Sequence, residues 1–333
     1  MNMQLPLDGM PRRLYSCTPS RLNAWLDCRR RYRFSYLDRP QPSKGPAWAH
    51  NSVGASVHNA LAGWWREPYE RRTPLTAAIL LTNGWITEGF RDAEQSGHWL
   101  GRARDLVSGY VATLDPSDDP VGVERTVATR TKVIALSGRI DRLDRRGDEL
   151  VVVDYKTGRR PLTQDDARSS LALAVYAVAA STMMRTPCRS VELHHLPTGE
   201  IVEWRHTEES LARHLGRAEE LATEASEADE RYRTLVKPPA KGATTSRSGR
   251  GAAAPGASRP GPGTSAPGAS RSGPGTSAPG ERQFVGPTPV PDEIDELFAP
   301  SPGPICSWCD FRRHCPEGQA AAPDRRPWDA LAE

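Results

Sequence analysis

The sequence contains no long uninterrupted apolar segment. Its longest apolar stretch, Leu171–Ala180, is far shorter than the about 20 residues that a helix needs to cross a bilayer. The first residues also lack the apolar centre of a secretory signal peptide. We therefore expect a cytoplasmic protein that does not contact a membrane. In that reducing compartment, thiols serve more often as metal ligands or core residues than in disulfides.

Apolar residues are scarce, and their shortage is concentrated in one part of the chain. They make up 37% of the 333 residues, against about 45 to 50% in globular domains. Between residues 243 and 280 there is no large apolar residue and no acidic residue, and the 12-residue sequence 256–267 is repeated with one change at 268–279. Such a segment cannot bury enough apolar surface to offset the conformational entropy that it would lose on folding. We expect the range 237–292 to be a disordered linker.

Charge of one sign is not in large excess, since the net charge is +3. The distribution is uneven, because residues 1–39 hold eight arginines and three aspartates. Basic side chains between aromatic ones suit a phosphate backbone and unstacked bases, although a solvated helix face has the same pattern. The side chains concerned are Arg29, Arg30, Arg31, Tyr32, Arg33 and Phe34.

The pattern of apolar residues divides the ordered chain into a helical part and a mixed part. Thr18 before Pro19 is typical of a helix start, and apolar spacing predicts a helical N-terminal part over 1–120. Its predicted helices cover 19–28, 52–65, 75–93 and 101–114. Three runs of β-branched residues then predict a β-meander at the start of a domain over 121–236. Its strands are predicted at 121–130, 132–140 and 150–155, with a turn at 145–148 between the last two. A helix is predicted to follow at 163–184. After it we expect a hairpin of 191–195 with 200–204 and then a helix at 207–233. The range 293–333 is a separate C-terminal segment.

Two acidic residues and a lysine stand at the ends of neighbouring predicted strands. Asp141 ends one strand, and Asp154, Tyr155 and Lys156 end the next. Because side chains alternate along a strand, Asp154 and Lys156 share a face and Tyr155 points to the other. If the two strands pair as a hairpin, Asp141 approaches Asp154. Carboxylates select Mg²⁺ or Mn²⁺, which can activate water for phosphodiester cleavage; the alternative is that these polar residues merely leave a buried strand at a turn.

The order GxxxH, GRIDR and VDYKTG resembles the RecB-like nucleases of the PD-(D/E)XK superfamily, including those of CRISPR adaptation. The resemblance covers residues 15–205 and 304–316. It implies an α/β, restriction-endonuclease-like fold with a mixed central sheet flanked by helices. It also implies a deoxyribonuclease, an exonuclease on single-stranded DNA or on DNA with single-stranded ends, in recombination, repair or CRISPR adaptation together with protein partners. The chain lacks a GK[ST] phosphate loop, so we expect no helicase motor on it.

The resemblance also assigns roles to individual positions. His58, in the GxxxH motif that begins at Gly54, is similar to a metal ligand of the family. Asp141 and Asp154 match the two acidic ligands. Tyr155 matches a position that contributes its backbone carbonyl, and Lys156 matches the catalytic lysine.

Two further positions qualify the resemblance. Glu124 is similar to an acidic residue often found at the start of the strands, and we assign it no role. The family commonly has Gln-Leu-x-x-Tyr on the helix after the lysine, and here Leu173 and Tyr176 match it while Ala172 stands at the glutamine position. Alanine cannot make the contacts of that glutamine. The alternative is therefore a non-catalytic DNA-binding module with a degenerate nuclease fold.

Three of the six cysteines form a ligand pattern near the end of the sequence. Cys306, Cys309 and Cys315 have the spacing Cys-x2-Cys-x5-Cys, and two cysteines separated by two residues can bind one metal. Cys28 resembles the N-terminal cysteine that completes a [4Fe-4S] cluster in the same family. The spacing alone also permits structural Zn²⁺, with His314 in place of one cysteine. We expect the two other cysteines, Cys17 and Cys188, to take no part.

Overall fold

The computed structural model describes residues 14–236 and 292–331. Apart from Asp292, the range predicted to be a linker lies outside the described residues. Within the two described ranges, no helix is both long and apolar enough to span a membrane.

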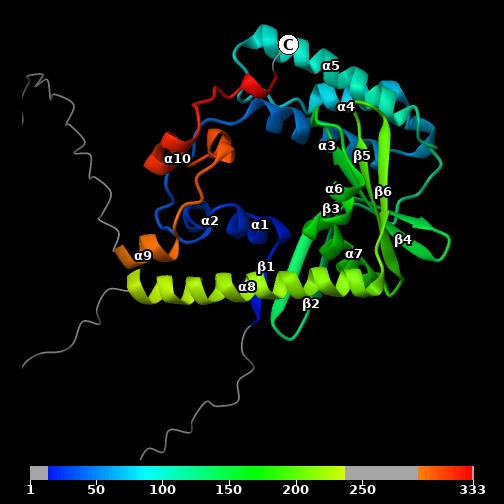
Figure 1. Cartoon of the computed structure of the whole chain (residues 1–333). Coiled ribbons are helices and arrows are strands. Elements are labelled where there is room, and N and C mark those ends of the chain that lie inside the picture. Colours follow the sequence, from blue (N-terminus) through cyan, green and yellow to red (C-terminus); the bar gives the residue numbers. More distant parts are fainter. Residues whose placement is uncertain (1–13, 237–291, 332–333) are drawn as a thin grey trace, which may run out of the picture.

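A mixed sheet of six strands forms the centre of the described chain (Figure 1). Its strand order is β1-β3-β4-β5-β6, and β2 pairs with the other edge of β3. The pairs β1·β3 and β4·β5 are parallel, and the others are antiparallel. The predicted α/β fold with a mixed central sheet is thereby confirmed. The strands are β1 (Tyr15–Cys17), β2 (Gly122–Arg130), β3 (Ile134–Arg146), β4 (Glu149–Lys156), β5 (Cys188–His195) and β6 (Glu200–Arg205).

Strand β3 has two different neighbours along one of its edges. Residues 134–136 pair with β1 and residues 142–146 pair with β4, while β2 occupies the opposite edge. Residues 137–141 of β3 are therefore unpaired on the edge between β1 and β4. This interruption opens the sheet at Asp141.

Helices cover both faces of the sheet and continue beyond it (Figure 1). Helix α7 packs on one face against Val127, Ile140 and Val152, and α3, α4 and α5 pack on the other against Val151 and Val153. Helix α8 contacts α1, α7 and β1. The helices are α1 (Pro19–Asp27), α2 (Arg29–Tyr36), α3 (Ala49–Arg66), α4 (Pro74–Asn83), α5 (Ala93–Val111), α6 (Gln164–Arg168), α7 (Leu171–Met184), α8 (Glu208–Val236), α9 (Asp292–Leu297) and α10 (Pro316–Ala321), with short 3₁₀ turns η1 (Tyr69–Arg71), η2 (Pro304–Trp308), η3 (Arg312–His314) and η4 (Asp329–Leu331).

Several predicted helix bounds were wrong because polar caps interrupt the apolar pattern. The helix expected at 75–93 is shorter in the structure, because α4 ends at Asn83 and Gly84 is its C-terminal cap. Helix α5 then begins after Asp92, whose side chain accepts a hydrogen bond from the Gln95 N–H. The helix expected at 163–184 is divided into α6 and α7, since Ser170 caps the second helix. By contrast, the start at Thr18 is confirmed, because its side chain accepts a hydrogen bond from the Arg21 N–H.

The strand expected to end at Asp141 was also predicted too short. Strand β3 continues to Arg146, pairing with β4 from Arg142 onward. The turn narrows to Gly147 and Asp148, and Gly147 has a φ of 59°, a left-handed conformation that glycine adopts without steric cost. Asp141 therefore lies inside a long strand, where its position is fixed from both sides. Strand β1 was not predicted.

The C-terminal segment 292–331 packs against the N-terminal helices (Figure 1). Arg33, which is 4% exposed, pairs with Asp295, and Arg30 pairs with Glu317. We had expected the side chains of both arginines to face phosphates or solvent. That prediction was wrong for Arg30 and Arg33, because the C-terminal segment covers α2. These ion pairs instead join regions that are far apart in the sequence.

Candidate active site

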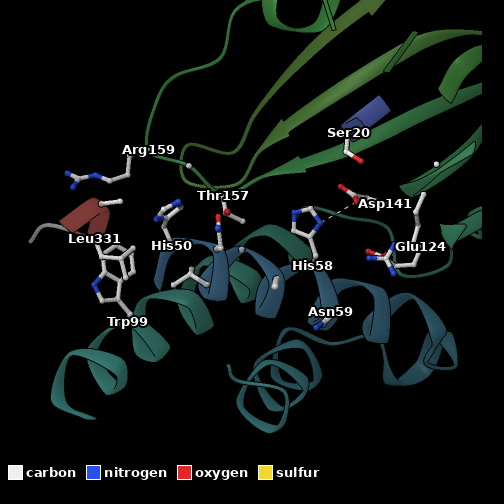
Figure 2. A pocket seen from close by; sticks show the side chains of 18 of the residues that line it. Ser20, His50, His58, Asn59, Trp99, Glu124, Asp141, Thr157, Arg159 and Leu331 are labelled. Atoms are coloured by element: carbon white, nitrogen blue, oxygen red, sulfur yellow. Dashed lines mark ion pairs between the residues drawn. The ribbon is translucent and has the colours of Figure 1, made fainter. Parts of the chain in front are cut away.

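Helix α3 and strand β3 bring a histidine and a carboxylate together at the interruption of the sheet. The Nδ1 atom of His58 lies 3.3 Å from Oδ1 of Asp141 (Figure 2). The other carboxylate oxygen, Oδ2, accepts a hydrogen bond of 2.8 Å from the Tyr155 N–H. The Tyr155 N–H has no backbone partner on β3 where β3 and β4 separate, and the Asp141 carboxylate accepts its hydrogen bond instead. This contact also fixes the position of the Asp141 side chain.

Glu124 completes a group of three possible metal ligands. Ligand atoms of His58, Glu124 and Asp141 all lie within 4.8 Å of one another. The pairing of Val123 with Arg142 and of Arg125 with Ile140 places Glu124 opposite Asp141. Glu124 has a φ of 48°, and a non-glycine residue in this region costs of order 1–3 kcal/mol and is typical of functional sites.

Asp154 and Lys156 stand beside this group on β4. The Lys156 Nζ atom lies 2.6 Å from Oδ2 of Asp154, and the register of β3 and β4, continued by one pair, places Asp154 opposite Asp141. Burial raises the pKa of Asp154, Lys156 opposes this shift, and the charge of Asp141 adds to it. The two carboxylates therefore interact electrostatically, and a cation between them would relieve their repulsion.

The charges of the site also act on His58. Burial favours the neutral imidazole, but the hydrogen bond to Asp141 and the charges of Asp141, Asp154 and Glu124 outweigh it, so the pKa of His58 is raised. All three carboxylates are thus close enough to stabilise a positive charge at this position. The same field favours a bound cation.

The Tyr155 side chain lies on the other face of β4, among buried polar groups. Its hydroxyl accepts a hydrogen bond of 3.1 Å from Trp65 Nε1. The guanidinium of Arg142, the last residue of the GRIDR motif, lies 5.1 Å from the Trp65 ring and pairs with Asp144. These contacts hold the end of β4, and with it the Tyr155 carbonyl, against helix α3.

Two glycines permit close packing around the site. A Cβ atom on Gly138 would lie 2.3 Å from Cε1 of Tyr176, and one on Gly54 would lie 3.3 Å from Oγ1 of Thr157. The absence of a side chain at Gly138 lets α7 bring the Tyr176 ring over β3. The GxxxH motif likewise lets α3 approach the turn after Lys156.

We predict that Gly138→Ala displaces the Tyr176 ring. Overpacking of this kind costs about 1–3 kcal/mol, so thermal unfolding should show a lower Tm. Gly216→Ala, on helix α8 with no heavy atom within 4 Å of the added Cβ, is the comparison for a glycine that does not face the site. A Gly138→Ala variant that is as stable as the wild type would contradict this packing.

A pocket of about 800 Å³ extends from these ligands along helix α3. Its wall includes residues that the sequence did not reveal as site residues, because they come from separate elements. They are His50, Trp99, Thr157, Arg159, Ala330 and Leu331. The only signal in the sequence was the spacing of His50, Gly54 and His58, which repeats every four residues and places them near one face of a helix.

The four cysteines of the predicted cluster line a second cavity. Cys28, which lies between α1 and α2, shares this cavity with Cys306, Cys309 and Cys315.

The other candidate ligands have different surroundings. His314 Nε2 lies 2.9 Å from the Ser43 carbonyl oxygen, and His314 is not among the described residues that line the cysteine cavity. Cys17 and Cys188 are buried in two separate apolar clusters.

Comparisons with known proteins give a family match. The family model of the PD-(D/E)XK nuclease superfamily matches residues 16–256. No curated protein sequence gives a significant match. Among solved structures, one from Eubacterium rectale, described provisionally as an exonuclease, has a TM-score of 0.41 and 11% sequence identity, and the match covers 70% of this chain and 88% of the other.

Proposed function

Since this chain belongs to the PD-(D/E)XK nuclease superfamily, we propose that it is a RecB-like deoxyribonuclease that depends on Mg²⁺ or Mn²⁺. The observation that carries the proposal is the convergence of His58, Glu124 and Asp141 on the wall of one large pocket, with the Asp154–Lys156 ion pair on the neighbouring strand. The proposed substrate is DNA that is single-stranded or has single-stranded ends, and the proposed mode is exonucleolytic. Recombination, repair and CRISPR adaptation are the proposed settings, with protein partners from those pathways.

The donor atoms of the site fit a hard divalent cation. Such cations prefer carboxylate and carbonyl oxygens, and Mn²⁺ accepts an imidazole as well. We propose that His58, Asp141 and Asp154 and the Tyr155 carbonyl hold the ion, as the family resemblance implies, and that Glu124 joins them. A bound ion would polarise the phosphodiester and lower the pKa of attacking water.

Lys156 acts on the substrate rather than on the metal. Its ammonium group is half exposed beside Asp154, so it can reach a phosphate that approaches the carboxylates. A positive charge held there stabilises the negative charge that develops on the phosphate oxygens in the transition state. Asp154, in turn, holds the lysine in place.

We further propose that Cys28, Cys306, Cys309 and Cys315 bind a [4Fe-4S] cluster rather than Zn²⁺. The family resemblance of Cys28 and of the Cys-x2-Cys-x5-Cys spacing supports this choice, and the four side chains line one cavity. Backbone and side-chain N–H groups point toward the sulfurs, since Arg31 N lies 3.5 Å from Cys28 Sγ and Arg30 Nη1 lies 3.9 Å from Cys315 Sγ. The cluster would join helices α1 and α2 to the C-terminal segment.

A cleavage assay tests the proposed function. End-labelled single-stranded DNA is incubated with the anaerobically purified protein in Mn²⁺, in Mg²⁺ or in EDTA, with closed circular DNA as the substrate without ends. We expect metal-dependent shortening of the linear strand and none of the circle. Binding without cleavage in every metal would instead favour the non-catalytic module that Ala172 suggests.

Glu124→Gln tests whether Glu124 holds the ion. Loss of one carboxylate ligand should weaken Mn²⁺ binding by at least about 10-fold. Mutation of residues that only hydrogen-bond to metal ligands already lowers metal affinity by about 10- to 100-fold. Binding is measured by calorimetry and by the electron paramagnetic resonance of free Mn²⁺. Glu227→Gln, an exposed position on α8, is the matched control. Equal Mn²⁺ affinities would mean that Glu124 serves to hold Arg139, with which it forms an ion pair of 2.7 Å.

A further inference from the structure

The pocket continues well beyond the proposed metal ligands. Figure 2 shows His50, Trp99, Arg159 and Leu331 together at one end, Asp141 and Glu124 at the other, and His58 between them. His50 precedes His58 by eight residues in α3, which corresponds to about 12 Å along the helix axis. Neighbouring nucleotides of one B-DNA strand are about 3.4 Å apart along the axis, so the two ends of the pocket are separated by more than one nucleotide.

The far end of the pocket combines a cation, a neutral polar group and apolar surface. Arg159 is exposed and follows the turn after Lys156. Burial lowers the pKa of His50, so its ring is neutral near pH 7, and its buried Nδ1 atom makes no hydrogen bond within the described chain. Trp99 and Leu331 supply the apolar wall. This combination suits a nucleotide, which has an anionic phosphate, polar base edges and an apolar ring face.

The segment 326–331 holds the wall in place. The Ala49 N–H, at the start of α3, donates a hydrogen bond of 3.0 Å to the Pro327 carbonyl. Leu331 is 4% exposed and packs with Val53 and Trp99. A pocket of about 800 Å³ is within the range of small-ligand sites, about 300–1,000 Å³. It therefore has room for a few nucleotides of one strand but not for a turn of duplex.

We propose that this end of the pocket is a nucleotide subsite, in which Arg159 contacts a backbone phosphate more than one nucleotide away from the cleaved bond. His50 hydrogen-bonds the same nucleotide, and Trp99 and Leu331 pack against its sugar and base. The subsite selects an unpaired strand and sets how it enters the metal site. The inference rests on the proposed nuclease function, but it concerns binding and can be measured without cleavage.

The test is the affinity for a short labelled single-stranded oligodeoxynucleotide, measured by fluorescence anisotropy in Ca²⁺ over a series of salt concentrations. Arg159→Ala should raise Kd about 10- to 100-fold, because a hydrogen bond to a charged group is lost. It should also reduce the slope of log K against log salt by about 0.7, the value for one phosphate contact on a single strand. His50→Phe keeps the ring packing on Trp308 and should raise Kd about 2- to 10-fold without changing the slope.

Two controls separate the subsite from general effects. Arg104→Ala removes an exposed positive charge from helix α5, outside the pocket, and should leave the Kd and the slope almost unchanged. Mn²⁺ affinity should be the same in the wild type, Arg159→Ala and His50→Phe.

Each other result has a definite meaning. An unchanged Kd and slope in Arg159→Ala, or an equal effect of Arg104→Ala, would overturn the subsite. Loss of Mn²⁺ affinity in parallel with DNA affinity would also overturn it, because the residues would then act on the metal site. Wild-type protein that binds the strand with these differences but never cuts it would refute the proposed nuclease activity and leave the subsite standing, whereas no binding at all would refute both.

Discussion

Asp141→Asn is expected to abolish detectable cleavage of DNA. Asparagine keeps an oxygen that can accept the Tyr155 N–H, so the contact between β3 and β4 can survive. It removes the negative charge that faces His58 and the proposed ion. Loss of one preorganised electrostatic group in an active site commonly costs about 10²- to 10³-fold in rate, and loss of the metal would add to this. Initial rates on labelled single-stranded DNA at saturating Mn²⁺ measure the effect.

The controls for Asp141→Asn distinguish a chemical from a structural effect. Asp165→Asn changes a carboxylate on α6 that is 76% exposed, and it should leave the rate and the Tm unchanged. Lys156→Ala should lose about as much cleavage activity as Asp141→Asn but should retain more of the Mn²⁺ affinity. The reason is that, in our proposal, Lys156 contacts the phosphate and not the metal. An Asp141→Asn variant that cuts DNA at the wild-type rate would remove the basis for hydrolysis at this site.

Cys28→Ala is expected to eliminate the iron and release the C-terminal segment. Structural metal binding contributes roughly 10–16 kcal/mol in small zinc peptides, so the loss of a cluster of similar strength should destabilise the chain by several kcal/mol. The variant should be colourless, have a lower Tm and be cut readily by protease within 292–331. Since Leu331 forms part of the pocket wall, DNA affinity should fall as well.

Cys188→Ala is the matched control for Cys28→Ala. Cys188 is the first residue of β5 and its thiol is buried in the apolar core, so the substitution costs some packing but should leave the iron content and the visible spectrum unchanged. Wild-type protein that is purified without oxygen and contains one zinc and no iron would replace the cluster proposal with the structural zinc site.

The local features of this protein could be read from the sequence because they depend on neighbouring residues. The cap at Thr18 and the strand pattern before Asp154 follow from interactions a few residues apart. The pairing of β3 with β4 also follows, since a short turn joins them. For the same reason, the position of Asp141 opposite Asp154 was predictable, whereas the bounds of α4 and α6 depended on caps that interrupt a continuing apolar pattern.

Other features depended on contacts between distant segments. Glu124 has no recognisable spacing relative to His58, and only the register of β2 against β3 and its left-handed backbone bring it to the group. The basic cluster of α2 resembled a phosphate-binding surface, yet Arg30 and Arg33 pair with the C-terminal segment. An arginine has the same chemistry in both settings, so composition alone could not distinguish them.

The sequence by itself indicated the strands and helices through periodicity, and it indicated the fold class and the candidate residues of both sites through the resemblance of its motifs to a known family. Only the tertiary structure decided that segment 326–331 closes the pocket beside His50 and Arg159. The hydrogen bond between Ala49 and Pro327 in this contact joins residues that are 278 positions apart in the sequence. Its formation depends on the packing of the whole C-terminal segment, which no local pattern encodes.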